Sequence, residues 1–351
     1  TMKRLSLIFL LLILIASCKE KKSESKSQVQ KDTAAPLSDD FTIVFASCND
    51  QNREQPLWLP ILENKPDLFI WGGDNIYSDT ADMEKMASDY NKQRSNPDYT
   101  KLRESTTVIG TWDDHDYGLN DAGVEWEQKE NAQRLFLDFL DFPEDDPLRF
   151  QKGIYYSRKY STDKGAVKVI LLDTRYYRDS LRKSKKKNRR YDAWNENEGG
   201  TVLGDIQWDW LEKELQDESA AFTVIVSSIQ FLADEHGWEK WGNHPSEVKK
   251  MYKTLKKAKS KNILFVSGDR HLAEFSVTNV PELPYDLVDF TTSGLTHTFP
   301  DSPKEPNRFR VGKVVKGLNF GVLHFDLEVE KASMEVRGVN NELLEVLEVQ
   351  Y

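Results

Sequence analysis

From residue 41 onward, short apolar runs alternate with stretches whose apolar residues recur at helical spacing. The runs predict buried strands at 41–46, 67–71, 107–112, 154–160, 167–173, 222–227 and 262–267. The helical spacing predicts helices over 55–64, 125–140, 203–216 and about 245–260, with a polar helical region at 81–105 that Pro97 interrupts. A long polar loop is expected at 179–202, and mainly short strands from about Val288, including 320–329 and 332–336. This pattern predicts an α/β fold built in layers, with a β-rich C-terminus.

The first residues have the pattern of an export signal. Lys3 and Arg4 precede the apolar run Leu5–Ile15, which is far shorter than the roughly 20 residues that span a bilayer. The run ends in 15–18, Ile-Ala-Ser-Cys, which resembles a bacterial lipoprotein processing site and implies cleavage before Cys18 and its lipidation. The alternative is a plain secretory signal with an incidental cysteine. We therefore expect residues 1–18 to be a lipoprotein signal peptide, and the protein to be membrane-anchored through lipid alone, in the periplasm or at the cell surface.

The remaining chain divides into a linker and a folded region. Residues 19–40 are polar and charged and predict a flexible tether, which leaves 41–351 as a single domain. The composition, with 38% hydrophobic and 30% charged residues, is that of a globular protein. A net charge of -10 argues against a nucleic-acid-binding surface. The basic run 183–190 is either a solvated loop or a positive rim that attracts anionic substrates.

Four predicted strands end in residues that can bind metals. The segments are SCND at 47–50, GGDNIY at 72–77, WDDHD at 112–116 and GDRH at 268–271. Because sites in open α/β sheets lie beyond the carboxyl ends of the strands, these segments can converge. Aspartate suits hard cations, histidine suits transition metals and cysteine favours softer ones. A carboxylate on the Gly72-Gly73 turn, Asp74, is a natural bridge between two cations. If Cys18 carries lipid, Cys48 has no partner for a disulfide, and metal ligation is one use for it.

The order of these motifs resembles the calcineurin-type metallophosphoesterases, and in particular their alkaline phosphatase D (PhoD-type) branch. Cys48 stands where the superfamily has its first Asp, and Tyr77 replaces the last Asp of the second motif. The segments 113–116 and 268–271 take the places of the Asn-His and His-rich motifs, and 171–175 and 203–215 also resemble the branch. The resemblance covers essentially all of the predicted domain, 41–351. It implies a layered metallophosphoesterase sandwich of two mixed β-sheets flanked by helices.

The resemblance also implies roles for individual residues. Cys48, Tyr77 and His271 would hold ferric iron, Asp74 would bridge, and Asp114 and Asp269 would help to hold calcium; zinc or manganese is the alternative metal. His115 would donate a proton to the leaving oxygen or stabilise the transition state. Where the superfamily has a lone histidine, this chain has Ser227–Gln230, with Gln230 or a water as the candidate ligand.

Several side chains keep two interpretations. Arg175 either binds a phosphate oxygen of the substrate or forms a structural salt bridge. His244 and His297 lie in loops that could rim the site or simply pack, whereas His236 is expected to be solvated and His324 structural. Trp238 and Trp241 are walls of a pocket mouth or loop packing.

Taken together, the motifs predict an exported enzyme that hydrolyses small phosphoesters, as an alkaline phosphodiesterase or phosphomonoesterase. Hydrolysis would use a binuclear metal site and a metal-bound hydroxide, since the chain has no evident nucleophilic serine or cysteine motif. The alternative from another class is a non-catalytic lipoprotein that binds a metal or an anion at a degenerate site. The oligomeric state stays open.

Overall fold

The apolar runs form two large mixed β-sheets in the computed structural model, which describes residues 41–300 and 305–351. The predicted signal peptide with lipidated Cys18 and the predicted tether, 1–18 and 19–40, lie outside the described residues. All described residues belong to one compact unit, Pro36–Tyr351. Among them, no helix is both long enough and apolar enough to cross a membrane.

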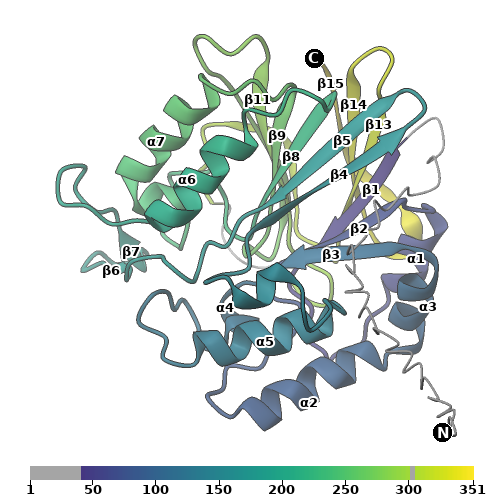
Figure 1. The fold of residues 1–351 in the computed structure, drawn as a ribbon, viewed down its shortest axis with the longest axis vertical. Coiled ribbons are helices and arrows are strands. Elements are labelled where there is room, and N and C mark those ends of the chain that lie inside the picture. Colours follow the sequence, from purple (N-terminus) through teal and green to yellow (C-terminus); the bar gives the residue numbers. More distant parts are fainter. Residues whose placement is uncertain (1–40, 301–304) are drawn as a thin grey trace, which may run out of the picture. The chain divides into compact units, whose positions relative to one another are not determined.

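The first sheet has the order β15-β14-β13-β1-β2-β3. Its strands are β1 (Phe41–Ala46), β2 (Leu68–Gly72), β3 (Thr107–Thr111), β13 (Phe320–Asp326), β14 (Lys331–Arg337) and β15 (Leu343–Gln350). Strands β1, β2 and β3 are parallel, with Val44 opposite Phe69 and Phe69 opposite Val108, and the C-terminal strands pair antiparallel beside β1. The β-rich C-terminus therefore completes the sheet that the N-terminal strands begin (Figure 1).

The second sheet has the order β12-β10-β11-β9-β8-β5-β4. Its strands are β4 (Tyr156–Thr162), β5 (Gly165–Leu171), β8 (Phe222–Ser227), β9 (Ile263–Ser267), β10 (Ala273–Asn279), β11 (Asp286–Thr292) and β12 (Arg310–Val315). The central strands β5, β8, β9 and β11 run parallel, whereas β4, β10 and β12 join antiparallel at the margins. Buried parallel strands read as continuous apolar runs, which is why β5, β8 and β9 were visible in the sequence, whereas β11 was not predicted as a separate strand.

The helices cover the outer faces of the sheets (Figure 1). They are α1 (Trp58–Glu63), α2 (Met83–Arg94), α3 (Pro97–Ser105), α4 (Asp114–Tyr117), α5 (Lys129–Phe139), α6 (Gly204–Glu214) and α7 (Pro245–Leu255), with short 3₁₀ turns η1 (Pro147–Phe150), η2 (Trp241–Asn243) and η3 (Val339–Asn341). Trp208 of α6 and Met251 of α7 share an apolar cluster with Ile225 of β8. On the other side, Trp58 of α1 lies 5.4 Å from the ring of Trp71, whose indole nitrogen donates to the Tyr99 hydroxyl at 2.9 Å. Pro97, the predicted break, is the first residue of α3.

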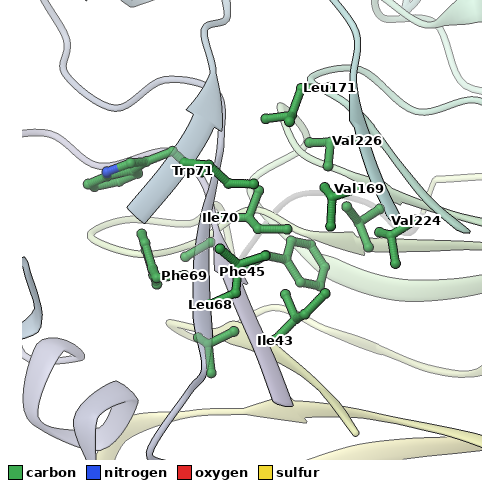
Figure 2. Packing of buried hydrophobic residues seen from close by; sticks show 14 of the residues in the cluster. Ile43, Phe45, Leu68, Phe69, Ile70, Trp71, Val169, Leu171, Val224 and Val226 are labelled. Atoms are coloured by element: carbon green, nitrogen blue, oxygen red, sulfur yellow. The ribbon is translucent and has the colours of Figure 1, made fainter. Parts of the chain in front are cut away.

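The main core lies between the two sheets. Ile43, Phe45 and Ile70 of the first sheet face Val169 and Val224 of the second (Figure 2). Along β2 the side chains alternate, so that Ile70 points into this core while Phe69 and Trp71 point towards the helices (Figure 2). The predicted layered sandwich of two mixed β-sheets is confirmed. The parallel strands of one sheet pack against the parallel strands of the other in this core.

Differences from the expected elements are local. Strands β1 and β8 have the predicted bounds, whereas the helix expected over 125–140 is the shorter α5. The expected loop 179–202 contains a small hairpin, β6 (Arg182–Lys183) with β7 (Tyr191–Asp192). The strand-rich region begins earlier than the expected Val288, with strand β10. The polar turn at 280–285 separates β10 from β11.

His244, which precedes α7, is fully buried and does not rim the site. Neither of its ring nitrogens has a hydrogen-bond partner among the described residues. Burial, together with the nearby Arg178 cation, lowers the pKa of His244 from 6.5 to about 3. The unfolded chain therefore takes up a proton below pH 6.5 that the folded chain does not.

This burial predicts an acid sensitivity that His244→Leu should reduce. Because the folded-state pKa is depressed, the free energy of unfolding falls as the pH drops from 6.5 towards 3, by about 1.4 kcal/mol per pH unit for this group. Denaturant unfolding of both proteins between pH 6.5 and 4.5 measures the difference. We expect a shallower slope for the variant, and parallel curves would show that His244 does not couple protonation to folding.

Candidate metal centre

The predicted metal-binding segments meet where the parallel strands of both sheets end. Cys48 follows β1, and its backbone N–H donates to the Gly73 carbonyl after β2 at 3.3 Å. In the second sheet, the Gly268 N–H after β9 donates to the Ser228 carbonyl after β8 at 3.1 Å. The four segments therefore form one junction at the carboxyl ends of the strands.

Gly73 allows this junction to close. Its φ of +106° is unfavourable for other residues, and a Cβ there would lie 2.7 Å from the Asp113 Cβ and 2.9 Å from the Ser228 Cβ. The glycine lets the β2 turn pass between the end of β3 and the end of β8. Asp74, the next residue, is thereby placed at the centre of the junction and is 1% exposed.

The Asp74 carboxylate faces two different sets of donors. Its Oδ2 accepts from the Tyr77 hydroxyl at 3.2 Å and from the Cys48 thiol at 3.5 Å. The Tyr77 hydroxyl lies 3.4 Å from Nε2 of His271. Cys48, Tyr77 and His271 thus lie on the Oδ2 side of Asp74, and its Oδ1 accepts the backbone N–H of His115 at 3.2 Å.

The second set consists of carboxylates. Asp74, Asp113, Asp114 and Asp269 each offer an oxygen within 4.8 Å of the others, and Asp74, Asp114 and His115 form an overlapping group. Oδ2 of Asp114 accepts from Asn120 at 2.9 Å and from the backbone of Asp121 at 2.6 Å, whereas its Oδ1 has no hydrogen-bond partner among the described residues. The structure brings together the six side chains to which metal binding was assigned, though not the alternative candidate Gln230, and adds Asp113, to which no role was assigned from the sequence.

Burial and neighbouring charges shift the pKa values of these groups. Burial raises the pKa of the Cys48 thiol and of the Tyr77 hydroxyl well above their usual values, and the Asp74 carboxylate raises both further. Burial also raises the pKa of Asp74, and it raises that of Asp269 to about 7. Because metals bind the deprotonated forms, cations would replace the protons that these groups otherwise keep. Oxygen-rich donors on one side and thiol, phenol and imidazole on the other fit two cations of different softness.

His115 is held beside this cluster by a residue that sequence reasoning missed. Its Nδ1 lies 2.6 Å from Oδ2 of Asp79, and its ring stacks on Tyr77 with centroids 4.0 Å apart. Burial lowers the pKa of His115, but the carboxylates of Asp114, Asp74 and Asp79 outweigh it and raise the pKa to about 11. The imidazolium form is therefore favoured. Asp79 lies in a polar loop, and nothing in its spacing indicated this contact.

Four predicted metal-binding residues have strained backbones. Cys48, Asp74, Asp269 and His271 have φ values of 61°, 50°, 67° and 53°, in the left-handed region. Non-glycine residues there cost of order 1–3 kcal/mol each and persist only where the surroundings enforce them. Ten other described non-glycine residues also have positive φ, so the strain is not confined to these four, but at these four it sets the direction of side chains that converge.

Arg175 forms the buried ion-pair network that was one of its two interpretations. Its Nε donates to Asp113 Oδ1 at 2.6 Å and its terminal nitrogen to Glu239 at 2.7 Å, and Glu239 also pairs with Arg178 at 2.9 Å. The Arg175 side chain has no exposed surface, so it offers no atom to a substrate in this structure. The network joins the end of β3 in one sheet to the loops after β5 and β8 in the other.

Other polar candidates have structural partners. The Asn75 amide donates to Asp116 at 2.6 Å and to the Thr111 carbonyl at 3.0 Å, so it holds the turn. Gln230 donates to Glu274 at 3.0 Å and to Thr291 at 2.9 Å, outside the carboxylate cluster. At the position of the lone histidine, Ser228 donates to Asp113 at 2.6 Å.

The loop aromatics separate into surface and core. His297 lies 4.9 Å from the Tyr77 ring and 4.5 Å from the His271 ring, at the rim of the junction. Trp238 is 43% exposed, whereas Trp241 is buried against Phe231. His236 was expected to be solvated, and that prediction is wrong because its ring is buried in the same loop.

Comparison with known proteins agrees with this geometry. The chain resembles several solved structures: "Structure of PhoD" (TM-score 0.68, 18% identity, 89% of this chain and 68% of that one) and a purple acid phosphatase of yellow lupin, Lupinus luteus (0.59, 10%, 90% and 55%). It also resembles a dimetal phosphatase from Danio rerio (0.52, 13%, 89% and 99%). These likenesses show the fold. No curated protein matches the sequence.

The acidic cluster could hold metal ions in this fold. The PhoD-like phosphatase family model matches residues 87–302, more than half of the chain. The chain therefore belongs to the PhoD-like phosphatase family, and it is a metal-dependent phosphatase or phosphodiesterase that acts on small phosphoesters.

The two interpretations of Arg175 predict different outcomes for Arg175→Met. Removing one partner of a buried ion pair leaves the other charge uncompensated, so the free energy of unfolding should fall by about 3–5 kcal/mol. Arg134→Met, at an exposed position of α5, should change it by less than about 0.5 kcal/mol. Denaturant unfolding of both variants measures the difference. An Arg175→Met protein of normal stability and raised KM would instead restore the substrate-binding role.

Proposed function

We propose that this chain is an exported phosphoester hydrolase with a binuclear centre in which Asp74 contacts both cations. The observation that carries the proposal is the position of the Asp74 carboxylate between a thiol–phenol–imidazole set and a carboxylate set. A carboxylate between two unlike donor sets would be placed to contact both cations of a two-metal site.

The two sides of the centre favour different metals. Cys48, Tyr77 and His271 would hold ferric iron, since anionic thiolate and phenolate suit a highly charged transition metal. Asp114 and Asp269 would hold calcium, which takes carboxylate oxygens; zinc or manganese is the alternative pair. When bound, such cations supply Lewis acidity and a clamp for the attacking and leaving oxygens of an in-line displacement.

His115 would deliver the proton that the leaving group needs. Its Nδ1 is engaged by Asp79, so the opposite nitrogen is the one left to face a substrate. The carboxylates around the ring keep it protonated in the absence of cations, and bound cations would weaken that effect. As the P–O bond breaks, the imidazolium proton passes to the leaving oxygen, which departs as the alcohol. Asp79 positions the ring and does not itself contact the phosphoester.

Activity and metal content test this proposal together. Purified wild-type protein should hydrolyse bis(p-nitrophenyl) phosphate with added calcium, and Asp74→Ala should lose both metals and more than about 100-fold in kcat/KM. In Tyr77→Phe, the first change expected is the loss of the visible absorption band from phenolate bound to iron. Asp145→Ala is the control, because Asp145 is exposed and is not one of the predicted site residues.

Three results would contradict parts of the scheme. A wild-type protein that hydrolyses nothing over a range of pH and metals would favour the non-catalytic alternative. Full activity in Asp74→Ala would overturn the bridging role. A colourless, active protein that contains only zinc would remove iron while leaving the hydrolase in place.

Lipid anchoring belongs to the same proposal and depends on residues 1–18 alone. Cys18→Ser should move the protein from the membrane fraction to the soluble fraction of cells that express the full chain, because the diacylated cysteine would be lost. Fractionation followed by immunoblotting measures the shift. Retention of the variant in the membrane fraction would contradict the lipoprotein interpretation.

A further inference from the structure

A cavity of about 420 Å³ opens beside the proposed metal centre. Asp114, His115, Asp269 and His271 line it at the metal centre, and the exposed rings of Trp238 and Phe299 line it towards solvent. Pockets for organic ligands begin at about 300 Å³, so the space accommodates more than a phosphate group. The part of the cavity away from the carboxylates is therefore available to a substituent of the phosphoester.

Two exposed aromatic rings mark that part. Trp238 is 43% exposed and Phe299 57% exposed, although both belong to residue types that are usually buried. Both are held by the turn that carries His271. The Arg270 guanidinium lies over the Trp238 ring at 5.3 Å, and the Phe299 ring lies 4.7 Å from the His271 ring. Rings fixed in this way lose little freedom when a ligand packs on them.

The two arginines of this wall each have an acidic partner, and Lys316, which also lines the cavity, donates to the Pro300 carbonyl at 3.4 Å. Arg270 pairs with Glu305, and Arg190 pairs with Asp121 at 2.5 Å. The basic run 183–190 therefore contributes Arg190 to the rim as half of an ion pair. The wall beyond the metal centre presents aromatic surface flanked by neutralised arginines, and this combination suits an uncharged planar group more than a second anion.

We infer that the enzyme selects phosphodiesters whose retained substituent carries a planar aromatic ring, with a nucleobase as the natural form, and that Trp238 and Phe299 bind this ring. The inference rests on the proposed phosphoesterase function. The chemistry is unchanged: water replaces the leaving alcohol on phosphorus, and the ring-bearing substituent stays on the phosphate. Glycerol or a simple alkyl group offers no π-face and would leave both rings in solvent.

Two substrates with the same leaving group test this inference. Thymidine 5′-(p-nitrophenyl phosphate) and methyl p-nitrophenyl phosphate both release p-nitrophenol and differ only in the retained group. Wild-type kcat/KM should favour the thymidine ester by at least about fivefold, the lower range of base stacking on an aromatic ring. In Trp238→Ala and Phe299→Ala this preference should fall, and in the double variant it should approach one.

A binding measurement and a control complete the experiment. Thymidine 5′-monophosphate should bind the wild-type holoenzyme more tightly than methyl phosphate by calorimetry, and Trp238→Ala should reduce that difference. Phe150→Ala removes a more exposed ring, 78% exposed, outside the lining of the cavity and should keep the wild-type preference. Equal kcat/KM for the two esters, or a preference unchanged in the double variant, would overturn this inference with the phosphoesterase intact. No hydrolysis of either ester would instead contradict the proposed function.

Discussion

The structure depends on the burial of several acidic groups at one point where two sheets meet. Asp74, Asp113, Asp114 and Asp269 lie together at the ends of parallel strands, with little or no exposed surface. Like charges in a low-dielectric interior repel strongly, so the cluster is unfavourable without compensation. The neighbouring Arg175 and His115 offset part of this repulsion, and bound metal ions would offset more of it.

Arg175 compensates Asp113, one of the four clustered carboxylates. By engaging Asp113, it secures the end of β3, and through Glu239 and Arg178 it ties that end to the loops of the second sheet. The core between the sheets sets their separation, and this network sets how their ends lie against each other. Support of this kind around a site limits the movement of the groups that would contact metals.

Much of the site could be predicted because its residues follow apolar strands directly. Cys48, Asp74, Asp114 and Asp269 each stand within a few residues of a strand that the apolar pattern reveals. The contacts of Asp79 with His115 and of Arg175 with Glu239 join residues 36 and 64 positions apart, and no periodicity encodes them. The sequence likewise does not distinguish the exposed Trp238 from the buried Trp241, because their burial depends on how the loop folds back. The small β6–β7 hairpin was missed because strands of two residues have no readable pattern.

The left-handed backbone of Cys48, Asp74, Asp269 and His271 also restricts how this centre can change during evolution. Asn, Asp, His and Gly tolerate that conformation, whereas β-branched residues do not. Of these residue types, Asn, Asp and His can also bind a metal through their side chains. Exchange of one such ligand for another would therefore strain the backbone less than replacement by a β-branched residue.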